Sequence, residues 1–547
     1  MTVKLLYFIL SFSLLISSSG LQADDGTDAM AKILPARLAS HVKFLADDLL
    51  EGRGTATRGY DLAALYVMTE FQQLGLKPAG KNGTFYQPIP FRKATTIREN
   101  CSFILIDKEG EHPLEYGKDY VMAADYSRPQ TSASAEVVFA GFGVTAPELK
   151  YDDYAGLDVK GEIVALLSNA PASFPVSARA HYNSALQKEK NAVAHGAIGI
   201  VTLRTADDEK RGPWDRVIRQ NKLSGFHWKD PSGQPNNFFP QIQITASLNK
   251  DGSTKLFAGS KSTFDEVSQQ AKDNKLHGFP LGFRASLKKE SKLEEAESPN
   301  VIAVLEGSDP ALKNEYIVYS AHLDHLGISD PVNGDPINNG AYDNATGVSS
   351  ILEIARAYTE CAKRPRRSIL FIALTGEEKG LQGSDYFANY PTVPQKSIVA
   401  DINVDMFMMI FPVADVVIMG AEHSSIGPIA EEAARTNGLK VSPDPTPEEV
   451  RFVRSDQYSF IKKGVPSIAM TAGQQSTDPS VNGAEAIKQW LRTIYHSPQD
   501  DINQHFDWET GVKAIRASFL TGYRIANADQ RPTWNPGDFF GKEFGNK

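Results

Sequence analysis

The chain has 547 residues, more than one hydrophobic core usually contains, so we expect at least two folding units. Hydrophobic residues make up 41% and charged residues 22% of the sequence, a globular composition that argues against intrinsic disorder. The net charge of -9 and the lack of a Lys/Arg cluster after an apolar segment exclude the basic surface that nucleic acid or a lipid surface would need.

Residues 1–23 have the pattern of a secretory signal peptide. A positive start ends at Lys4, an apolar run at 5–16 is too short to span a bilayer comfortably, and a small and polar exit follows. We predict cleavage after Ala23, with Gly20 as the alternative position. The mature protein is then secreted or periplasmic and has no stable membrane anchor; a retained signal anchor is the alternative.

The part of the chain before residue 300 changes character at about residue 121. Apolar residues at helical spacing predict two helices within 35–76, separated by a glycine break at 51–54, and the apolar stretch 100–107 predicts a strand. From 121 to 278, short β runs alternate with Gly and Pro, which indicates a small β-rich domain. The elements expected in it are strands at 135–142, 161–168 and 197–203 and a helix at 189–196.

From residue 298 onward strands and helices alternate, which predicts an α/β layered fold. A helix is predicted at 345–360, because Val348, Ile351 and Leu352 line one face and Pro365 follows its end. The charged run 288–297 is interpreted as a solvated linker or a strand edge. The predicted strands are 300–305, 317–321, 368–374, 398–404, 415–419 and 466–471.

Side chains that often bind metals follow three of these strands. His322 comes directly after 317–321, Glu377 and Glu378 come shortly after 368–374, and Asp405 comes after 398–404. Because the carboxyl ends of strands in an open α/β sheet face one crevice, we expect these side chains to meet. Two further candidates are Asp343, just before the predicted helix, and His496 in the segment YHS at 495–497.

Two imidazoles and three carboxylates form a donor set that suits zinc, with cobalt or manganese as substitutes. If Asp343 bridges, these five side chains can hold two metal ions that share a water, whose lowered pKa makes it a nucleophile at neutral pH. His325 could compete as a ligand or only form a hydrogen bond. The predicted ligands are therefore His322, Asp343, Glu378, Asp405 and His496.

Three other side chains are candidates for catalytic roles. One carboxylate must stay free of metal to take a proton from the water, and Glu377 can do so while Glu378 binds metal. Asp324, two residues after His322, can accept the second imidazole N–H and fix the tautomer. Tyr495 could donate its hydroxyl to the developing oxyanion, or it could be an ordinary packed aromatic residue.

Five segments in this order resemble the M28 metallopeptidases: SAHLDHLG at 320–327, GAYDNATG at 340–347, TGEEKGLQGS at 375–384, NVDM at 403–406 and YHS at 495–497. The resemblance implies a mixed central sheet flanked by helices, of the zinc exopeptidase type. It also implies two zinc ions, with Glu377 as general base and Asp324 orienting His322. The ligand sets it implies are His322, Asp343 and Asp405 for one ion, and Asp343, Glu378 and His496 for the other.

The middle region resembles the protease-associated domain often inserted in this family, through segments 158–168 and 188–203. The implied division is 24–120 for the N-terminal part of the peptidase domain, 121–278 for the inserted domain and 279–547 for the catalytic domain. One departure concerns the segment 454–460, where Gln457 stands in place of the family's usual His. This departure affects the substrate side of the site rather than the metal ligands.

We therefore expect an aminopeptidase that releases N-terminal residues from peptides. A carboxypeptidase of the same family would need a cationic pocket for the substrate carboxylate, which Arg451 or Arg454 could supply. A glutaminyl cyclase-like enzyme and a non-catalytic binding homologue are the remaining alternatives. The presence of all five predicted ligands and of Glu377 argues against both of them.

Overall fold

The computed structural model describes residues 25–545. The predicted signal peptide at 1–23 lies outside these residues, so it remains a prediction, as does the secreted or periplasmic location. Between residues 25 and 545, no helix is both long enough and apolar enough to cross a membrane.

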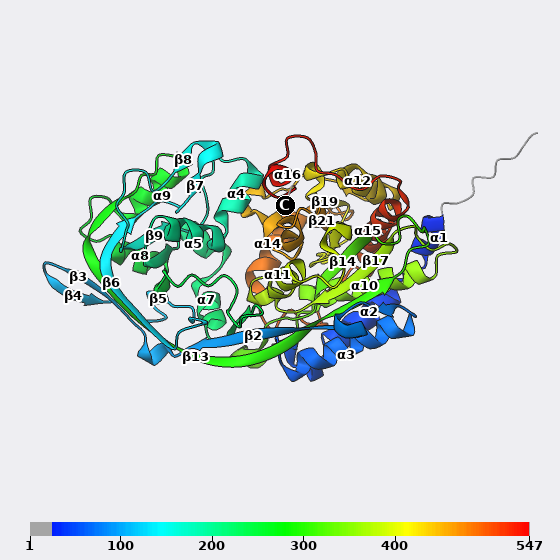
Figure 1. Ribbon diagram of the computed structural model, residues 1–547, viewed down its shortest axis with the longest axis horizontal. Coiled ribbons are helices and arrows are strands. Elements are labelled where there is room, and N and C mark those ends of the chain that lie inside the picture. Colours follow the sequence, from blue (N-terminus) through cyan, green and yellow to red (C-terminus); the bar gives the residue numbers. More distant parts are fainter. Residues whose placement is uncertain (1–24, 546–547) are drawn as a thin grey trace, which may run out of the picture.

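A mixed sheet forms the centre of the part of the molecule drawn on the right of Figure 1. Its strands are parallel from β17 through β14 and β18 to β21, and β13 and β19 pair antiparallel on either side of this set. The strands, in spatial order, are β11 (Gly225–Trp228), β2 (Tyr86–Thr96), β13 (Phe279–Leu305), β17 (Ser368–Leu374), β14 (Tyr316–His322), β18 (Ile398–Asn403), β21 (Ser467–Ala472), β19 (Asp415–Met419) and β20 (Lys440–Val441).

Helices cover both faces of this first sheet. Successive residues of a strand point to opposite faces, so in the buried strand β17 Phe371 belongs to one apolar core and Leu370 to another. The predicted α/β fold with a mixed central sheet flanked by helices is confirmed. The core of Phe371 is covered by α2 (Pro35–Leu45), α3 (Arg58–Gln73), α10 (Thr346–Thr359) and α15 (Trp508–Asn527), and that of Leu370 by α11 (Gln382–Asn389) and α13 (Gln457–Ile461).

A second sheet, with cores of its own, forms the left half of Figure 1. We call residues 102–223 and 244–290 the second unit, and the rest of the described chain the first unit. The second unit contains the strands β3 (Ser102–Asp107), β4 (Gly110–Pro113), β5 (Tyr120–Val121), β6 (Gln130–Phe139), β9 (Ile163–Leu167), β10 (Gly199–Leu203) and β12 (Ile244–Leu248). Its helices include α4 (Val176–Asn183), α5 (Ala185–Ala194), α7 (Trp214–Asn221), α8 (Lys250–Leu256) and α9 (Phe264–Lys272).

Strand β13 belongs to both sheets. Its residues 279–290 pair with β6 and β3, and its residues 291–305 pair with β2 and β17, which gives the long ribbon along the bottom of Figure 1. The charged run 288–297 lies inside this strand, so the linker interpretation was wrong, and Lys288 at its start pairs with β3 on one side and β6 on the other. Exposed Lys288 and Lys292 alternate there with buried Lys289 and Ser291, as the two-residue period of a strand requires.

The sheet pairings differ from the predicted division of the chain at three places. Strands β3 and β4 precede residue 121 but belong to the second sheet, and β11 lies within 121–278 but extends the first sheet through β2. Residues 279–290 of β13 fall in the predicted catalytic domain but pair with β6 and β3 of the second sheet. The resemblance of the second unit to a protease-associated domain remains a prediction.

Candidate metal centre

Three parallel strands end beside one another at the edge of the first sheet. His322 is the last residue of β14, Glu377 and Glu378 follow β17 after a two-residue turn, and Asp405 follows β18 after one residue. Strand β14 lies between β17 and β18 in register, so the three ends meet as predicted.

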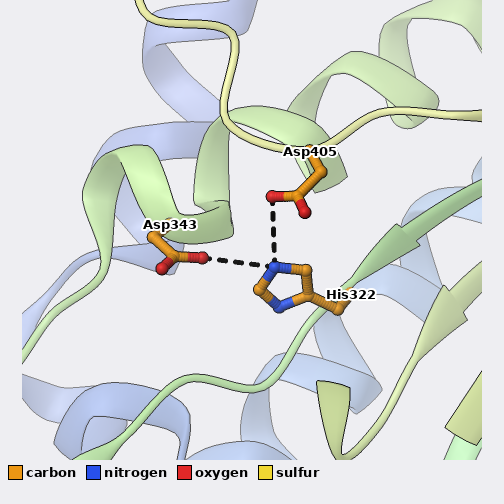
Figure 2. A group of neighbouring side chains, drawn as sticks. All are labelled: His322, Asp343 and Asp405. Atoms are coloured by element: carbon orange, nitrogen blue, oxygen red, sulfur yellow. Dashed lines mark ion pairs between the residues drawn. The ribbon is translucent and has the colours of Figure 1, made fainter. Parts of the chain in front are cut away.

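One group of potential ligands gathers around His322, as Figure 2 shows. The Nε2 atom of His322 lies 3.2 Å from Oδ1 of Asp343 and 3.4 Å from Oδ1 of Asp405. His322 is buried, and Oδ1 of Asp405 has no hydrogen-bond donor of its own. A nitrogen and two carboxylate oxygens therefore converge on one point.

A second group shares Asp343. The Nε2 atom of His496 lies 3.2 Å from Oδ2 of Asp343 and 3.2 Å from Oε2 of Glu378. Asp343 thus presents one oxygen to each group, which is the arrangement that a bridging carboxylate requires.

His325 also reaches the second group. Its Nδ1 atom lies 2.7 Å from Oε1 of Glu378 and 3.8 Å from Oδ2 of Asp343, and the three side chains are close enough to hold an ion. The structure therefore brings six side chains together rather than the five predicted ligands. Of the two imidazoles, that of His496 lies nearer to the bridging Asp343.

The electrostatics of these groups fit a bound cation. Burial lowers the pKa of His496, but the carboxylates of Glu378 and Asp343 outweigh this effect and raise the pKa to about 9. The same negative charge that favours a proton on His496 would favour a metal cation at this position. The buried Oε1 of Glu378 and Oδ1 of Asp405 lack hydrogen bonds of good geometry. Nitrogen and carboxylate donors without thiolates suit zinc.

Asp343 is held by its backbone. Both Tyr342 and Asp343 donate their backbone N–H groups to the carboxylate of Asp500, at 2.9 and 3.0 Å. Gly340, with φ +61, begins this loop, and a Cβ there would lie 2.1 Å from the backbone oxygen of Asp343. Sequence reasoning did not single out Asp500, which lies four residues after His496.

Asp324 acts on two neighbours. Its backbone oxygen lies 3.0 Å from Nδ1 of His322, whereas its carboxylate is 4.0 Å from the same atom. The carboxylate instead accepts the backbone N–H of Glu377 at 3.0 Å and the hydroxyl of Thr55 at 2.9 Å. Asp324 therefore orients His322 through its main chain, and its side chain fixes the turn that carries Glu377.

The side chains of Glu377 and Tyr495 face the charged groups. Burial raises the pKa of Glu377 well above its usual value, with a further contribution from Glu378 against the opposing charge of His322. Burial, Asp343 and Glu378 likewise raise the pKa of Tyr495, which keeps its hydroxyl protonated. The Tyr495 ring stacks on His496 with 3.7 Å between centroids.

The segment with Gln457 supports the first group of ligands. Ser455 donates its hydroxyl to Oδ2 of Asp405 at 2.6 Å, and Asn403 donates to both Ser455 and Gln457. Gln457 is buried and donates in turn to the backbone oxygen of Phe452. Gln457 therefore links Asn403 to the backbone at Phe452. The segment contacts Asp405 through Ser455, and sequence reasoning missed this role of Ser455.

Arg53 ties the glycine break of the N-terminal helices to the site. Its buried guanidinium donates to the backbone oxygens of Leu323 at 2.9 Å and Gly340 at 2.9 Å, beside two ligand-bearing segments, and also to those of Leu45 and Asn339. Burial lowers the pKa of Arg53 to about 10, against Asp500 and Asp343, so the group stays charged at neutral pH.

Replacing Arg53 with methionine is expected to lower the free energy of unfolding by at least about 3 kcal/mol, because four buried carbonyl groups would each lose one donor. Denaturant unfolding measures this loss. Arg37→Met, at an exposed position of α2, is the matched control and should leave stability unchanged. Equal stability of the two variants would contradict this role of Arg53.

A cavity of about 380 Å³ opens beside the second group and has walls from both units. Glu378, Lys379 and His496 line it. The rest of its lining consists of uncharged side chains, many of them small. These are Ala94, Thr96, Ala123, Ala124, Tyr126, Gln220, Asn221, Leu223, Ser224, Gly225 and Leu326.

Residues 300–519 match the family model described as Peptidase family M28. The chain is 33% identical to "Aminopeptidase NAALADL1" of Mus musculus over 134 residues, which are 23% of this chain and 16% of that protein. It is 34% identical to a "Probable zinc metalloprotease" of Pyrenophora teres f. teres over 255 residues, which are 43% of this chain and 50% of that protein. The chain thus spans half or less of these two relatives.

Among solved structures, the fold is similar to "Aminopeptidase from Aneurinibacillus sp. strain AM-1", with a TM-score of 0.54 and 17% identity. The likeness covers 94% of this chain and 97% of that chain, so the shared fold includes both units.

Proposed function

We propose that the chain, whose residues 300–519 match the model of peptidase family M28, is an aminopeptidase that uses two zinc ions to hydrolyse the first peptide bond of its substrates. The observation that carries the proposal is the pair of ligand groups that share Asp343 beside a cavity. A site for two ions favours a peptidase over a single-metal cyclase. The proposed ligands are His322, Asp343 and Asp405 for one ion, and Asp343, Glu378 and His496 for the other.

When bound, zinc would supply polarisation of the scissile carbonyl and a lowered pKa of the attacking water. Glu377 then takes the proton of that water and later transfers it to the leaving amine. Burial raises the pKa of Glu377 above its usual value, which makes its carboxylate a stronger base. The hydrogen bond from its backbone N–H to Asp324 keeps this carboxylate in place.

Tyr495 supplies a neutral donor for the oxyanion of the tetrahedral intermediate. Its pKa is raised by burial and by the carboxylates of Asp343 and Glu378, so it keeps its proton throughout the reaction. Its stacking on His496 restricts the ring to one side of the site.

The direction of cleavage depends on which end of the peptide is recognised. Of the two arginines considered for a carboxylate pocket, Arg451 is already paired with Asp444 at 2.8 Å. Arg454 is exposed, and Lys379 is the cationic side chain of the cavity. The buried carboxylates around the ligand groups favour a positively charged α-amine at the site.

Blocking one end of a short peptide at a time tests the proposal. We expect N-terminal acetylation of an uncharged tetrapeptide to abolish cleavage, and C-terminal amidation to leave kcat/KM within about twofold. Mass spectrometry of the products identifies the residue released. Cleavage that survives acetylation but not amidation would favour a carboxypeptidase instead.

A further inference from the structure

Helix α7 of the second unit is anchored at both of its ends. Trp214, in its first turn, donates to the backbone oxygen of Gly117 at 2.8 Å. At its other end, Asn221 donates to the backbone oxygen of Met122 at 2.9 Å and accepts from the hydroxyl of Tyr116 at 2.6 Å. The helix is thus fixed to the second unit rather than held only by the surface that it faces.

The same helix contacts the first unit next to the metal ligands. Arg216 donates to the backbone oxygens of Leu491 and Arg492, both at 3.0 Å, at the end of helix α14 (Gly483–Thr493). Its guanidinium lies 5.6 Å from the ring centroid of Tyr495. One turn later, Gln220 lies 2.8 Å from Nδ1 of His496.

His496 is placed differently from His322. His322 ends a central strand, and its Nδ1 is held by Asp324 only two residues away. His496 lies in a turn after α14 with φ +55, a backbone conformation that non-glycine residues rarely adopt. Within residues 25–545, the group that hydrogen-bonds its Nδ1 is Gln220, from the other unit.

Metal binding fixes which way this hydrogen bond runs. An imidazole that gives the lone pair of Nε2 to zinc carries its proton on Nδ1, so Nδ1 must donate. A half-turn about the Cγ–Cδ bond of Gln220 exchanges its amide oxygen and nitrogen, which have nearly the same shape, and places the oxygen acceptor against Nδ1 of His496. Gln220 can therefore hold the imidazole in the tautomer and orientation that zinc needs.

We propose that Gln220 is a positioning residue for His496, so that helix α7 of the second unit completes the zinc site of the first. The inference rests on the proposed role of His496 as a ligand. The second unit then contributes to metal affinity as well as lining the cavity. Arg216 contributes by fixing the end of α14 from which Tyr495 and His496 emerge.

Zinc affinity of the purified full chain tests this inference. In Gln220→Leu, which removes the acceptor, the zinc ion assigned to Asp343, Glu378 and His496 should bind roughly 10–100-fold less tightly in competition with a chromogenic chelator. Gln220→Glu, which keeps an acceptor, should retain near wild-type affinity. Asp215→Asn, at an exposed position of the same helix, is the control and should change nothing. Turnover of the Leu variant should recover in excess zinc.

His496→Ala separates this inference from the proposed function. If that variant loses one zinc while Gln220→Leu and Gln220→Ala bind both ions with wild-type affinity, the role of Gln220 is wrong and the ligand set stands. If His496→Ala itself keeps both ions, the ligand assignment is wrong. Gln220→Ala is included because a helix accepts alanine readily, so a folding defect of the Leu variant does not decide the result.

Discussion

Replacing Glu377 with glutamine is expected to lower kcat roughly 10²–10⁴-fold, the usual contribution of a general base, while both zinc ions remain bound. The amide has the size of the carboxylate but cannot accept the proton of the attacking water. Glu377 belongs to neither of the two ligand groups found within residues 25–545, so zinc content should not change. KM should stay near the wild-type value, because the loss is confined to the chemical step. Steady-state kinetics on an aminoacyl p-nitroanilide, with metal analysis of the same sample, measures both quantities.

The adjacent position supplies the matched comparison. Glu378→Gln should instead lose zinc, since Glu378 is one of the ligands proposed for the second ion. Glu485→Gln, on the exposed side of α14, should behave like the wild type. A Glu377 variant that turns over at the wild-type rate would remove the general base from the mechanism, and one that has lost zinc would reverse the assigned roles of the two glutamates.

Removing zinc by dialysis against a chelator should reduce peptidase activity to background and lower the melting temperature. Without a cation, the closely spaced carboxylates of Asp343, Glu378 and Asp405 repel one another. Each site stabilises the fold by about 2.7 kcal/mol when free zinc is 100 times its Kd. Differential scanning calorimetry and activity assays follow the loss.

Two equivalents of zinc should restore both activity and melting temperature. Magnesium is the control ion, because it prefers an octahedral set of oxygen ligands and should restore neither. Full turnover of the zinc-free protein, or equal recovery with magnesium, would contradict the proposed zinc chemistry.

The elements that position the candidate site could be predicted from sequence because their signals are local. The apolar run 368–374 coincides with β17, and the helix predicted at 345–360 is α10, Thr346–Thr359. The Gly and paired glutamates after the apolar run mark where β17 ends. The ends of β17, β14 and β18 meet because the three strands are parallel.

Residues that support the ligands could not be predicted in the same way. Gln220 and His496 are 276 positions apart, and Ser455 reaches Asp405 from 50 positions away, so neither contact leaves a period or a spacing in the sequence. Arg53 stood in a segment recognised as a break, but its four carbonyl partners come from other loops. Lys289 made β13 difficult to predict for another reason. It is charged but buried, so the sequence around it does not show the alternation of polar and apolar residues that is typical of a strand.

The continuity of β13 means that the second unit is not a removable module. A deletion of residues 121–278 would take away β6, the strand that pairs with Phe279–Glu290, and with it most of the sheet that shields Leu281 and Leu287. What remained would be a long strand with an unpaired apolar edge, a template for aggregation. Exchange of this region between related proteins would therefore have to carry the first half of β13 along with it, so the natural points for recombination lie within a strand rather than in a loop.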